Sequence, residues 1–214
     1  MSKVFFFVSV SLDGYLVPPG MDLEHAGDPK HEDWGAQWGK LQSWLLATRF
    51  FRKNTGFGEG GDTGADNQIA EQTFQRTGVS IMGKRMFDLG EQAWPEEAPF
   101  HTLVFVVTHE KRDPWERPGG TTFHFVNDGI ETALDQARAA AGDRDVRIAG
   151  GGATILEYVN AGLIDEFSIA LSPVLFGSGI RLFEGVDAGR VALELVRTEP
   201  SPRASHLTYT VRER

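Results

Sequence analysis

Residues 146–159 read VRIAGGGATILEYV, and this stretch decides the fold. A short apolar run with β-branched residues precedes three glycines, Gly150, Gly151 and Gly152, and apolar residues at helical spacing follow them. The pattern predicts a strand, a tight turn and a helix whose first N–H groups have no partner and attract anions. Glycine lacks the Cβ that would keep a phosphate from the backbone. Because no lysine follows, the stretch is not a P-loop, and a turn without a ligand remains an equal alternative.

A second junction of the same kind follows the apolar run at 79–82, where Gly83, Lys84 and Arg85 precede a helical pattern. Two cations at a helix N-terminus oppose the helix dipole, which indicates an anion that compensates them. Arginine also suits a two-pronged contact with phosphate. The alternative is a solvated basic pair.

Polar residues end two further predicted strands. Residues 4–10 are nearly all apolar, as in a central strand covered on both faces, and Asp13 follows in an Asp-Gly turn. That carboxylate either lies at a ligand site at the end of the strand or holds an Asx-turn. The strand at 103–107 ends in Thr108 and His109, which either contact a phosphate or ribose or are structural.

Composition excludes several classes of function. The chain has 214 residues, a length that favours one domain, and a net charge of -9, which argues against a nucleic-acid partner. It has no cysteine, which excludes disulfides, thiolate catalysis and cysteine-bound zinc and fits a cytoplasmic location. The six histidines lack metal-ligand spacing, and the N-terminal apolar run is too short to span a membrane. We therefore expect no metal and no membrane partner.

The remaining segments complete an α/β pattern. We expect a loop at 17–33 that could act as a lid, then an apolar helix face at 34–45 whose tryptophans belong to the core or an interface. Asp66 and Asp128 are candidate N-caps of two predicted helices, which run through about residue 76 and over 130–141 respectively. A strand at 166–171 and alternating runs at 191–198 and 207–211 close the chain. Strands alternate with helices as far as residue 170, which predicts a mainly parallel sheet with an antiparallel C-terminal edge.

Five segments together resemble the dihydrofolate reductase-like superfamily, most closely the branch that shares a domain with the riboflavin-biosynthesis reductase. They are SLDGYL at 11–16, IMGKRMFD at 81–88, VVTH at 106–109, RIAGGGATILEYV at 147–159 and LIDEFSIALSPVLFGSGIRLF at 163–183. The resemblance implies a three-layer fold with helices on both faces of the sheet and a single domain over residues 1–214. It also implies that the protein pairs as a homodimer.

The resemblance implies an NADPH site and hydride transfer to a C=N or C=O bond of a small molecule. The implied contacts are Val10, Ser11 and Leu16 beside the nicotinamide, Gly83, Lys84 and Arg85 at the adenosine phosphates, Thr108 and His109 at the ribose and 2′-phosphate, and Gly150, Gly151, Gly152, Ala153 and Thr154 at the pyrophosphate. Asp13 is the carboxylate expected in the substrate pocket, where it orients a substrate or relays a proton.

Two departures from the relatives qualify the expected substrate. The acidic residue with which dihydrofolate reductases bind the pterin has no clear counterpart, although Asp33 lies nearby. The zinc signature of the deaminase that often accompanies the riboflavin reductase is absent from the sequence, because there is no cysteine. Two other functions stay open: a protein that binds the nucleotide cofactor without turnover, and a flavin-dependent enzyme.

Overall fold

The computed structural model describes residues 2–21 and 33–213. The helices in this part of the chain are α1 (Asp33–Leu41), α2 (Ser43–Leu46), α3 (Arg49–Asn54), α4 (Ala65–Arg76), α5 (Lys84–Ala93), α6 (Ile130–Ala141) and α7 (Gly152–Asn160). The strands are β1 (Val4–Ser11), β2 (Tyr15–Val17), β3 (Thr77–Gly83), β4 (Leu103–Val107), β5 (Trp115–Glu116), β6 (Thr122–Val126), β7 (Asp145–Gly150), β8 (Glu166–Ser172), β9 (Ile180–Arg181), β10 (Val191–Pro200) and β11 (Ser205–Glu213).

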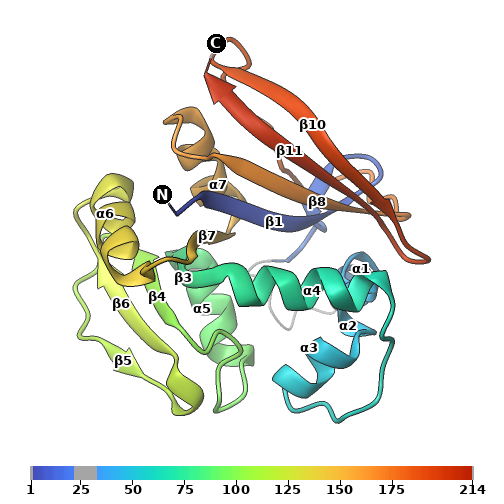
Figure 1. Ribbon diagram of the computed structural model, residues 1–214, viewed down its shortest axis with the longest axis horizontal. Coiled ribbons are helices and arrows are strands. Elements are labelled where there is room, and N and C mark those ends of the chain that lie inside the picture. The colour runs from blue at the N-terminus through green and yellow to red at the C-terminus, as the bar shows by residue number, and fades with distance from the viewer. Residues whose placement is uncertain (1, 22–32, 214) are drawn as a thin grey trace.

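The described residues form one nine-stranded sheet in the order β10-β11-β8-β1-β7-β3-β4-β6-β5 (Figure 1). The six strands from β8 to β6 run parallel to one another. The hairpin of β10 and β11 adds an antiparallel edge beside β8, which confirms the predicted C-terminal edge. The opposite edge carries the short strand β5, which pairs antiparallel with β6.

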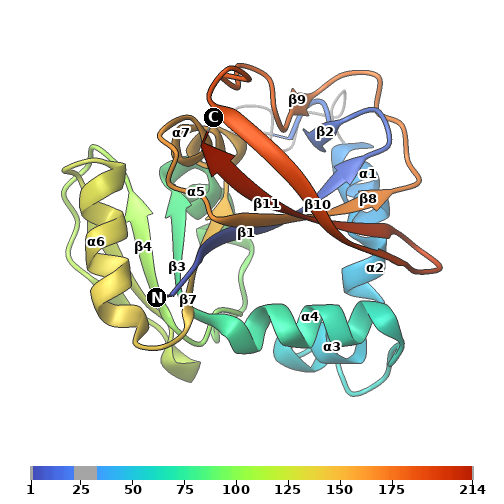
Figure 2. The same cartoon turned by 45° about the horizontal axis from the view of Figure 1, so that its top comes forward.

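Helices cover both faces of the sheet, so the three-layer α/β prediction is confirmed. On one face, α6 and α7 pack on the largest core cluster, to which β1 contributes Val4 and Phe6. On the other face, α2 and α4 pack around Phe7, and α5 packs against β3 and β4. The two views show α6 beside β4 at one end of the molecule and the β10–β11 hairpin at the other (Figures 1 and 2). Strand β1 is buried on both faces, as its continuous apolar sequence predicts.

Three local predictions need correction. The tryptophan-containing segment is not one helix but breaks at Gln42, whose side-chain oxygen accepts a hydrogen bond from Ser9 Oγ at 2.7 Å. Trp44 donates to the same Ser9 oxygen and is only 4% exposed, so its indole belongs to the core. Neither predicted aspartate caps its helix: the N-caps of α4 and α6 are glycines.

The carboxylate of Asp66 accepts a hydrogen bond instead from a buried histidine, His206, with 2.7 Å between its Oδ1 and Nε2. This pair links α4 to β11, 140 residues further along the chain. Burial explains the difference, because a carboxylate inside the protein needs a charged or hydrogen-bonding partner more than a helix end needs a cap.

Strands β2 and β9 form a separate two-stranded sheet that sequence patterns do not predict. It brings the segment after β1 against the segment after β8. The expected lid at 17–33 lies mostly outside the described residues, as does the side chain of Asp33.

Candidate active site

The predicted site residues gather along one edge of the parallel sheet. Strands β1, β7, β3 and β4 are consecutive neighbours, and their carboxyl ends carry Ser11, Gly150, Gly83 and Thr108 respectively. Because adjacent strands lie about 4.8 Å apart, the four ends span roughly 14 Å. An elongated ligand laid across them would pass from β1, over the glycine turn of β7, to β4.

The two predicted strand–glycine–helix junctions lie in direct contact. A Cβ added at Gly83 would lie 2.2 Å from Oγ1 of Thr154, so only glycine fits there. Gly83 and Gly151 are the N-caps of α5 and α7, and neither helix has a side-chain cap or an acidic residue in its first turn. Two uncapped helix N-termini side by side form a place where unpaired N–H donors and helix dipoles both favour an anion.

The glycine turn itself is open at its centre and closed at its flanks. A Cβ at Gly151 would meet no atom within 4 Å, whereas one at Gly150 would approach Met86 Sδ at 2.9 Å. A Cβ at Gly152 would lie 3.1 Å from Leu16 Cδ2 and 3.6 Å from Ile180 Cγ2. The β2–β9 sheet therefore covers one flank of the turn, and the space in front of Gly151 is open.

The basic pair is divided between two environments. Lys84 Nζ is 2.7 Å from Asp88 Oδ1 and 3.3 Å from Glu110 Oε2, and the hydrogen bond to Asp88 raises the pKa of Lys84. Arg85 is exposed, and no carboxylate among the described residues pairs with it. Arg85 is thus a cation beside the two helix N-termini whose charge no carboxylate of the described residues neutralises.

The carboxylate of Asp13 holds the loop that follows β8. Its Oδ1 accepts a hydrogen bond from Ser11 Oγ at 2.6 Å, and its Oδ2 accepts from the N–H groups of Gly177 at 2.7 Å and Phe176 at 3.1 Å. The bond from Ser11 is the largest cause that lowers the pKa of Asp13 to about 2, and the two amides lower it further. Asp13 is therefore ionised at neutral pH, which suits holding a loop better than donating a proton.

Several residues predicted to contact the cofactor have side chains that are buried or already hydrogen-bonded within the protein. Val10 is buried in the core, and Ser11 Oγ already bonds to Asp13 and to the N–H of Tyr15, so neither side chain is free for a ligand. Thr108 is 6% exposed, and its hydroxyl accepts from the N–H of Glu110. His109 and Ala153 are exposed and face solvent.

The sequence analysis missed two features of the site, and only the second of them has a local signal. Arg181 donates to the carbonyl oxygen of Asp13 at 2.9 Å and to Tyr15 Oη at 3.1 Å, which ties β9 to the end of β1. Nothing in the local pattern of GSGIRLF signals that contact, since the partners lie more than 160 residues away. The pairing of Lys84 with Asp88 was accessible from their i,i+4 spacing.

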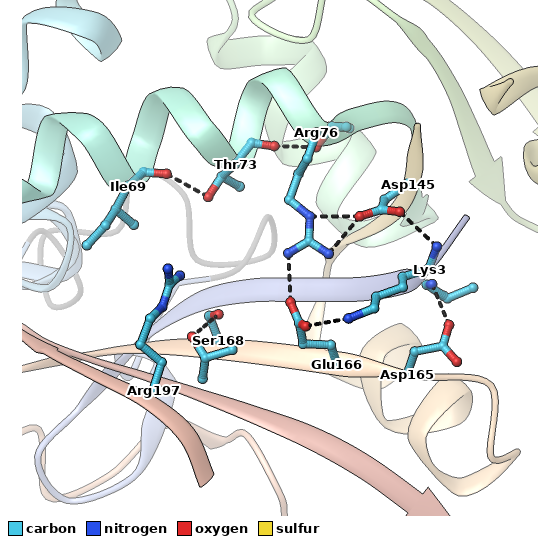
Figure 3. A network of polar contacts seen from close by, with 12 residues as sticks. Lys3, Ile69, Thr73, Arg76, Asp145, Asp165, Glu166, Ser168 and Arg197 are labelled. Carbon is cyan, nitrogen blue, oxygen red and sulfur yellow. Dashed lines mark hydrogen bonds and ion pairs between the residues drawn. The ribbon is translucent and has the colours of Figure 1, made fainter. Parts of the chain in front are cut away.

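A groove of about 590 Å³ lies at the opposite end of the strands, between α4 and β8, β10 and β11, and contains none of the predicted cofactor residues. Figure 3 shows the ion network beside it: Arg76 Nη1 is 2.7 Å from Glu166 Oε1, Arg76 Nε is 2.8 Å from Asp145 Oδ2, and Lys3 Nζ is 3.0 Å from Glu166 Oε2. Burial raises the pKa of Glu166, but the hydrogen bonds from Arg76 and Lys3 outweigh it and hold that pKa below its usual range. These charges neutralise one another at the first residues of β7 and β8. We therefore interpret the network as ion pairs that stabilise the fold by linking α4 to these strands.

The family model of the RibD C-terminal domain matches residues 2–207. The chain therefore belongs to the RibD C-terminal domain family, and its sheet and helices have the dihydrofolate reductase-like fold. The Bacillus subtilis (strain 168) protein YyaP is 30% identical over 124 residues, which are 55% of this chain and 65% of YyaP. YwjB of the same strain is 32% identical over 85 residues, or 40% of this chain and 48% of YwjB. The matches thus span less than two thirds of either relative.

Solved structures share the fold at low sequence identity. A Shewanella sp. PV-4 protein whose name places it in riboflavin biosynthesis has a TM-score of 0.64 at 20% identity, over 98% of this chain and 99% of that one. A Thermotoga maritima diaminohydroxyphosphoribosylaminopyrimidine deaminase/5-amino-6-(5-phosphoribosylamino)uracil reductase has a TM-score of 0.57 at 14% identity, over 98% of this chain and 56% of that one. Enterococcus faecalis dihydrofolate reductase, complexed with NADP(H) and RAB-propyl, has a TM-score of 0.54 at 13% identity, over 98% and 96%.

Residues 2–21 and 33–213 contain no group of three or more histidine or acidic side chains arranged to hold a metal ion. No helix in these ranges has both the length and the apolar sequence needed to cross a bilayer.

Proposed function

We propose that this protein is a reductase that uses NADPH to reduce a C=N or C=O bond of a small heterocyclic or carbonyl substrate. The single observation that carries the proposal is the contact of the two uncapped helix N-termini at Gly83 and Thr154, with open space in front of Gly151. Membership of the RibD C-terminal domain family supports a reductase, and the Enterococcus faecalis neighbour is complexed with NADP(H).

The residues at this edge fit a dinucleotide that carries several negative charges. The first-turn N–H groups of α7 would bind the pyrophosphate, and those of α5 with Arg85 would bind the phosphate of the adenosine. Leu16 and Ile180 flank Gly152 and would exclude water from the nicotinamide end. When bound, the nicotinamide supplies the hydride.

The preference for NADPH over NADH depends on Arg85 in this proposal. Lys84 already has two carboxylate partners, so a further anion gains less from its charge. The exposed guanidinium of Arg85 is free of such competition among the described residues and suits a 2′-phosphate.

Asp13 is proposed to position the site rather than to transfer a proton. Its bonds to the amides of Phe176 and Gly177 fix the loop that leads into β9, and β9 covers the glycine turn. Because that carboxylate is engaged, proton delivery to the substrate would come from water or from the substrate itself.

The test is oxidation of NADPH by the purified protein, followed at the nicotinamide absorbance, with a panel of small imines, ketones and pyrimidine compounds. Acceptor-dependent oxidation that needs a higher NADPH concentration in Gly151→Ala than in the parent supports the proposal. Saturable NADPH binding without oxidation by any acceptor would favour the second candidate, a cofactor-binding protein without turnover, to which the engaged state of Asp13 also points. A purified protein with a flavin spectrum and no affinity for NADPH would contradict both.

A further inference from the structure

Strand β7 carries a cation, Arg147, that no anion of the described residues neutralises. Its side chain lies on the face of the sheet that α4 covers, with the guanidinium carbon 5.7 Å from the centroid of the Phe74 ring. Its Nε is shielded from solvent and has no hydrogen-bond partner, and no carboxylate within residues 2–21 and 33–213 forms an ion pair with it. Burial alone lowers the pKa of Arg147 to about 10, so the side chain remains charged at neutral pH.

Arg76 shows how a similar cation on the same face is compensated. Its guanidinium also covers an aromatic ring, that of Phe5, at 3.9 Å. It has two carboxylate partners, Asp145 and Glu166, each at 2.7 Å. Buried charges are as a rule paired in this way, because an unpaired one loses its hydration and gains nothing in return. Arg147 lacks such compensation among the described residues, which indicates an anion that binds beside it.

The position of Arg147 between two helices leaves it accessible. In the sheet it is level with Phe5 of β1 and Ser80 of β3, and Ser80 is level with Val104 of β4. Helix α4 covers the Phe5 end of this row, and α5 packs over its Val104 end. Phe5 and Val104 are buried, whereas Arg147 is partly exposed. A small ligand can therefore reach part of this side chain.

The same face of β7 leads to the glycine turn. Alternate residues of a strand share a face, so Ala149 follows Arg147 on this face, and Gly150 begins the turn one residue later. Met86 of α5 approaches the turn, with its Sδ 2.9 Å from a Cβ added at Gly150. Gly150 lies three residues, or roughly 10 Å, beyond Arg147 along the strand. A small molecule between α4 and α5 could therefore contact Arg147 at one end and a nicotinamide at the carboxyl ends of the strands at the other.

We propose that Arg147 binds a carboxylate group of the substrate and so makes this protein selective for acidic acceptors. The inference rests on the proposed reductase function and names the class of molecule that it reduces. A planar carboxylate matches two parallel N–H groups of a guanidinium. The substrate would present its C=N or C=O bond roughly 10 Å or less from that carboxylate.

The charge balance favours a carboxylate over a phosphate. A phosphate monoester carries about 1.5–2 negative charges at neutral pH, whereas one guanidinium supplies a single positive charge. The neighbours Phe5, Phe74 and Ser80 carry no charge that would balance the excess. A carboxylate neutralises Arg147 one for one and leaves no net charge in a partly buried position.

The first test measures binding of benzoate, of its neutral analogue benzamide and of phenyl phosphate to the purified full-length protein, by ligand-observed nuclear magnetic resonance. The parent should bind benzoate about 10-fold to 150-fold more tightly than benzamide, which is the worth of a hydrogen bond to a charged group. Arg147→Met should remove that difference. Arg138→Met, which removes the same charge from an exposed position of α6, should retain it. Phenyl phosphate bound more tightly than benzoate by the parent would overturn the carboxylate assignment.

Melting curves of the same variants without ligand establish that they are folded and separate binding from a structural role. An uncompensated cation destabilises the folded state, and methionine can fill the same space beside Phe74. Arg147→Met should therefore melt at or above the temperature of the parent. A variant that melts well below the parent would show that the cation serves the fold, and this result would overturn the proposal.

The second test compares NADPH oxidation with oxo acids and with the neutral amides made from them. The parent should show a higher kcat/KM for the acids by a similar factor, and Arg147→Met should treat acid and amide alike. If the parent reduces neutral acceptors as well as acidic ones and binds benzoate no better than benzamide, the role of Arg147 is wrong and the reductase proposal stands. If benzoate binding depends on Arg147 but no acceptor oxidises NADPH, the reductase proposal fails, and with it the assignment of the carboxylate to a substrate.

Discussion

Gly151→Ala separates the fold of the glycine turn from its proposed role in binding. The backbone at Gly151 has φ −69° and ψ −174°, which alanine adopts freely, and its new methyl group would meet no atom within 4 Å. Replacing glycine at such a position gains about 0.4–1 kcal/mol through the unfolded state, but glycine is also the better N-cap. These effects oppose each other, so we expect a melting temperature within about 4 °C of the parent.

The same methyl group would occupy the space that the pyrophosphate needs in front of the first turn of α7. A phosphate held away from these N–H groups loses charge-assisted hydrogen bonds, each worth about 1.5–3 kcal/mol. Affinity for NADPH should therefore fall by about 10-fold to 150-fold, measured by fluorescence titration of protein whose melting curve has been recorded.

Gly64→Ala is the matched control. Gly64 is the N-cap of α4, with φ −74° and ψ −155°, no side-chain cap and no atom within 4 Å of an added Cβ. It should share any small change in stability and leave NADPH affinity unchanged. If Gly151→Ala binds NADPH as tightly as Gly64→Ala does, the glycine turn does not face the cofactor and our reasoning about the site is refuted.

Three further substitutions test the charges. Arg85→Ala should weaken NADPH binding by about 1–3 kcal/mol and abolish most of the preference for NADPH over NADH. Lys84→Ala should weaken NADPH binding less, since Asp88 and Glu110 already pair with the Lys84 ammonium. Equal losses of NADPH affinity in the two titrations would contradict the different roles given to Arg85 and Lys84. Arg76→Ala should lower the free energy of unfolding by about 2–3 kcal/mol in denaturant titrations, less than for a fully buried pair because Arg76 is partly exposed, and should spare NADPH affinity; a parallel loss of affinity would count against a purely structural network. The pKa of Asp13 is lowered in the folded state to about 2, so its contribution to stability is complete above about pH 4 and lost as pH falls toward 2. Asp13→Asn should remove this pH-dependent contribution from melting curves recorded across this range. Identical curves for parent and variant would show that the carboxylate does not stabilise the loop.

The regular frame was predictable because its signals are local. The helix over 130–141, the strand over 103–107 and the two strand–glycine–helix junctions each follow from apolar spacing and turn residues within about a dozen positions. Their assembly at one sheet edge follows from parallel topology, which places all carboxyl ends together.

The features that escaped prediction depend on contacts between distant segments. The buried pair of Asp66 and His206 overrides a local capping signal, and the break at Gln42 follows a hydrogen bond to β1. The β2–β9 sheet needs two short segments more than 160 residues apart, neither of which has the length to signal a strand alone.

The role of Asp13 shows the limit most clearly. An Asp-Gly pair at a strand end is compatible with a ligand-site carboxylate and with a turn, and the sequence does not distinguish them. The amides of Phe176 and Gly177 that occupy its carboxylate belong to a loop far along the chain. The three-dimensional structure therefore favours a positioning role that spacing alone left open.

The measurement that tests the central proposal most directly is a titration of the purified protein with NADPH and, separately, with NADH, followed by tryptophan fluorescence. The account predicts saturable binding of both and tighter binding of NADPH, because Arg85 stands beside two uncapped helix N-termini. Absence of saturable binding for either nucleotide would contradict it, and the glycine turns would then serve only to pack helices α5 and α7 against the sheet.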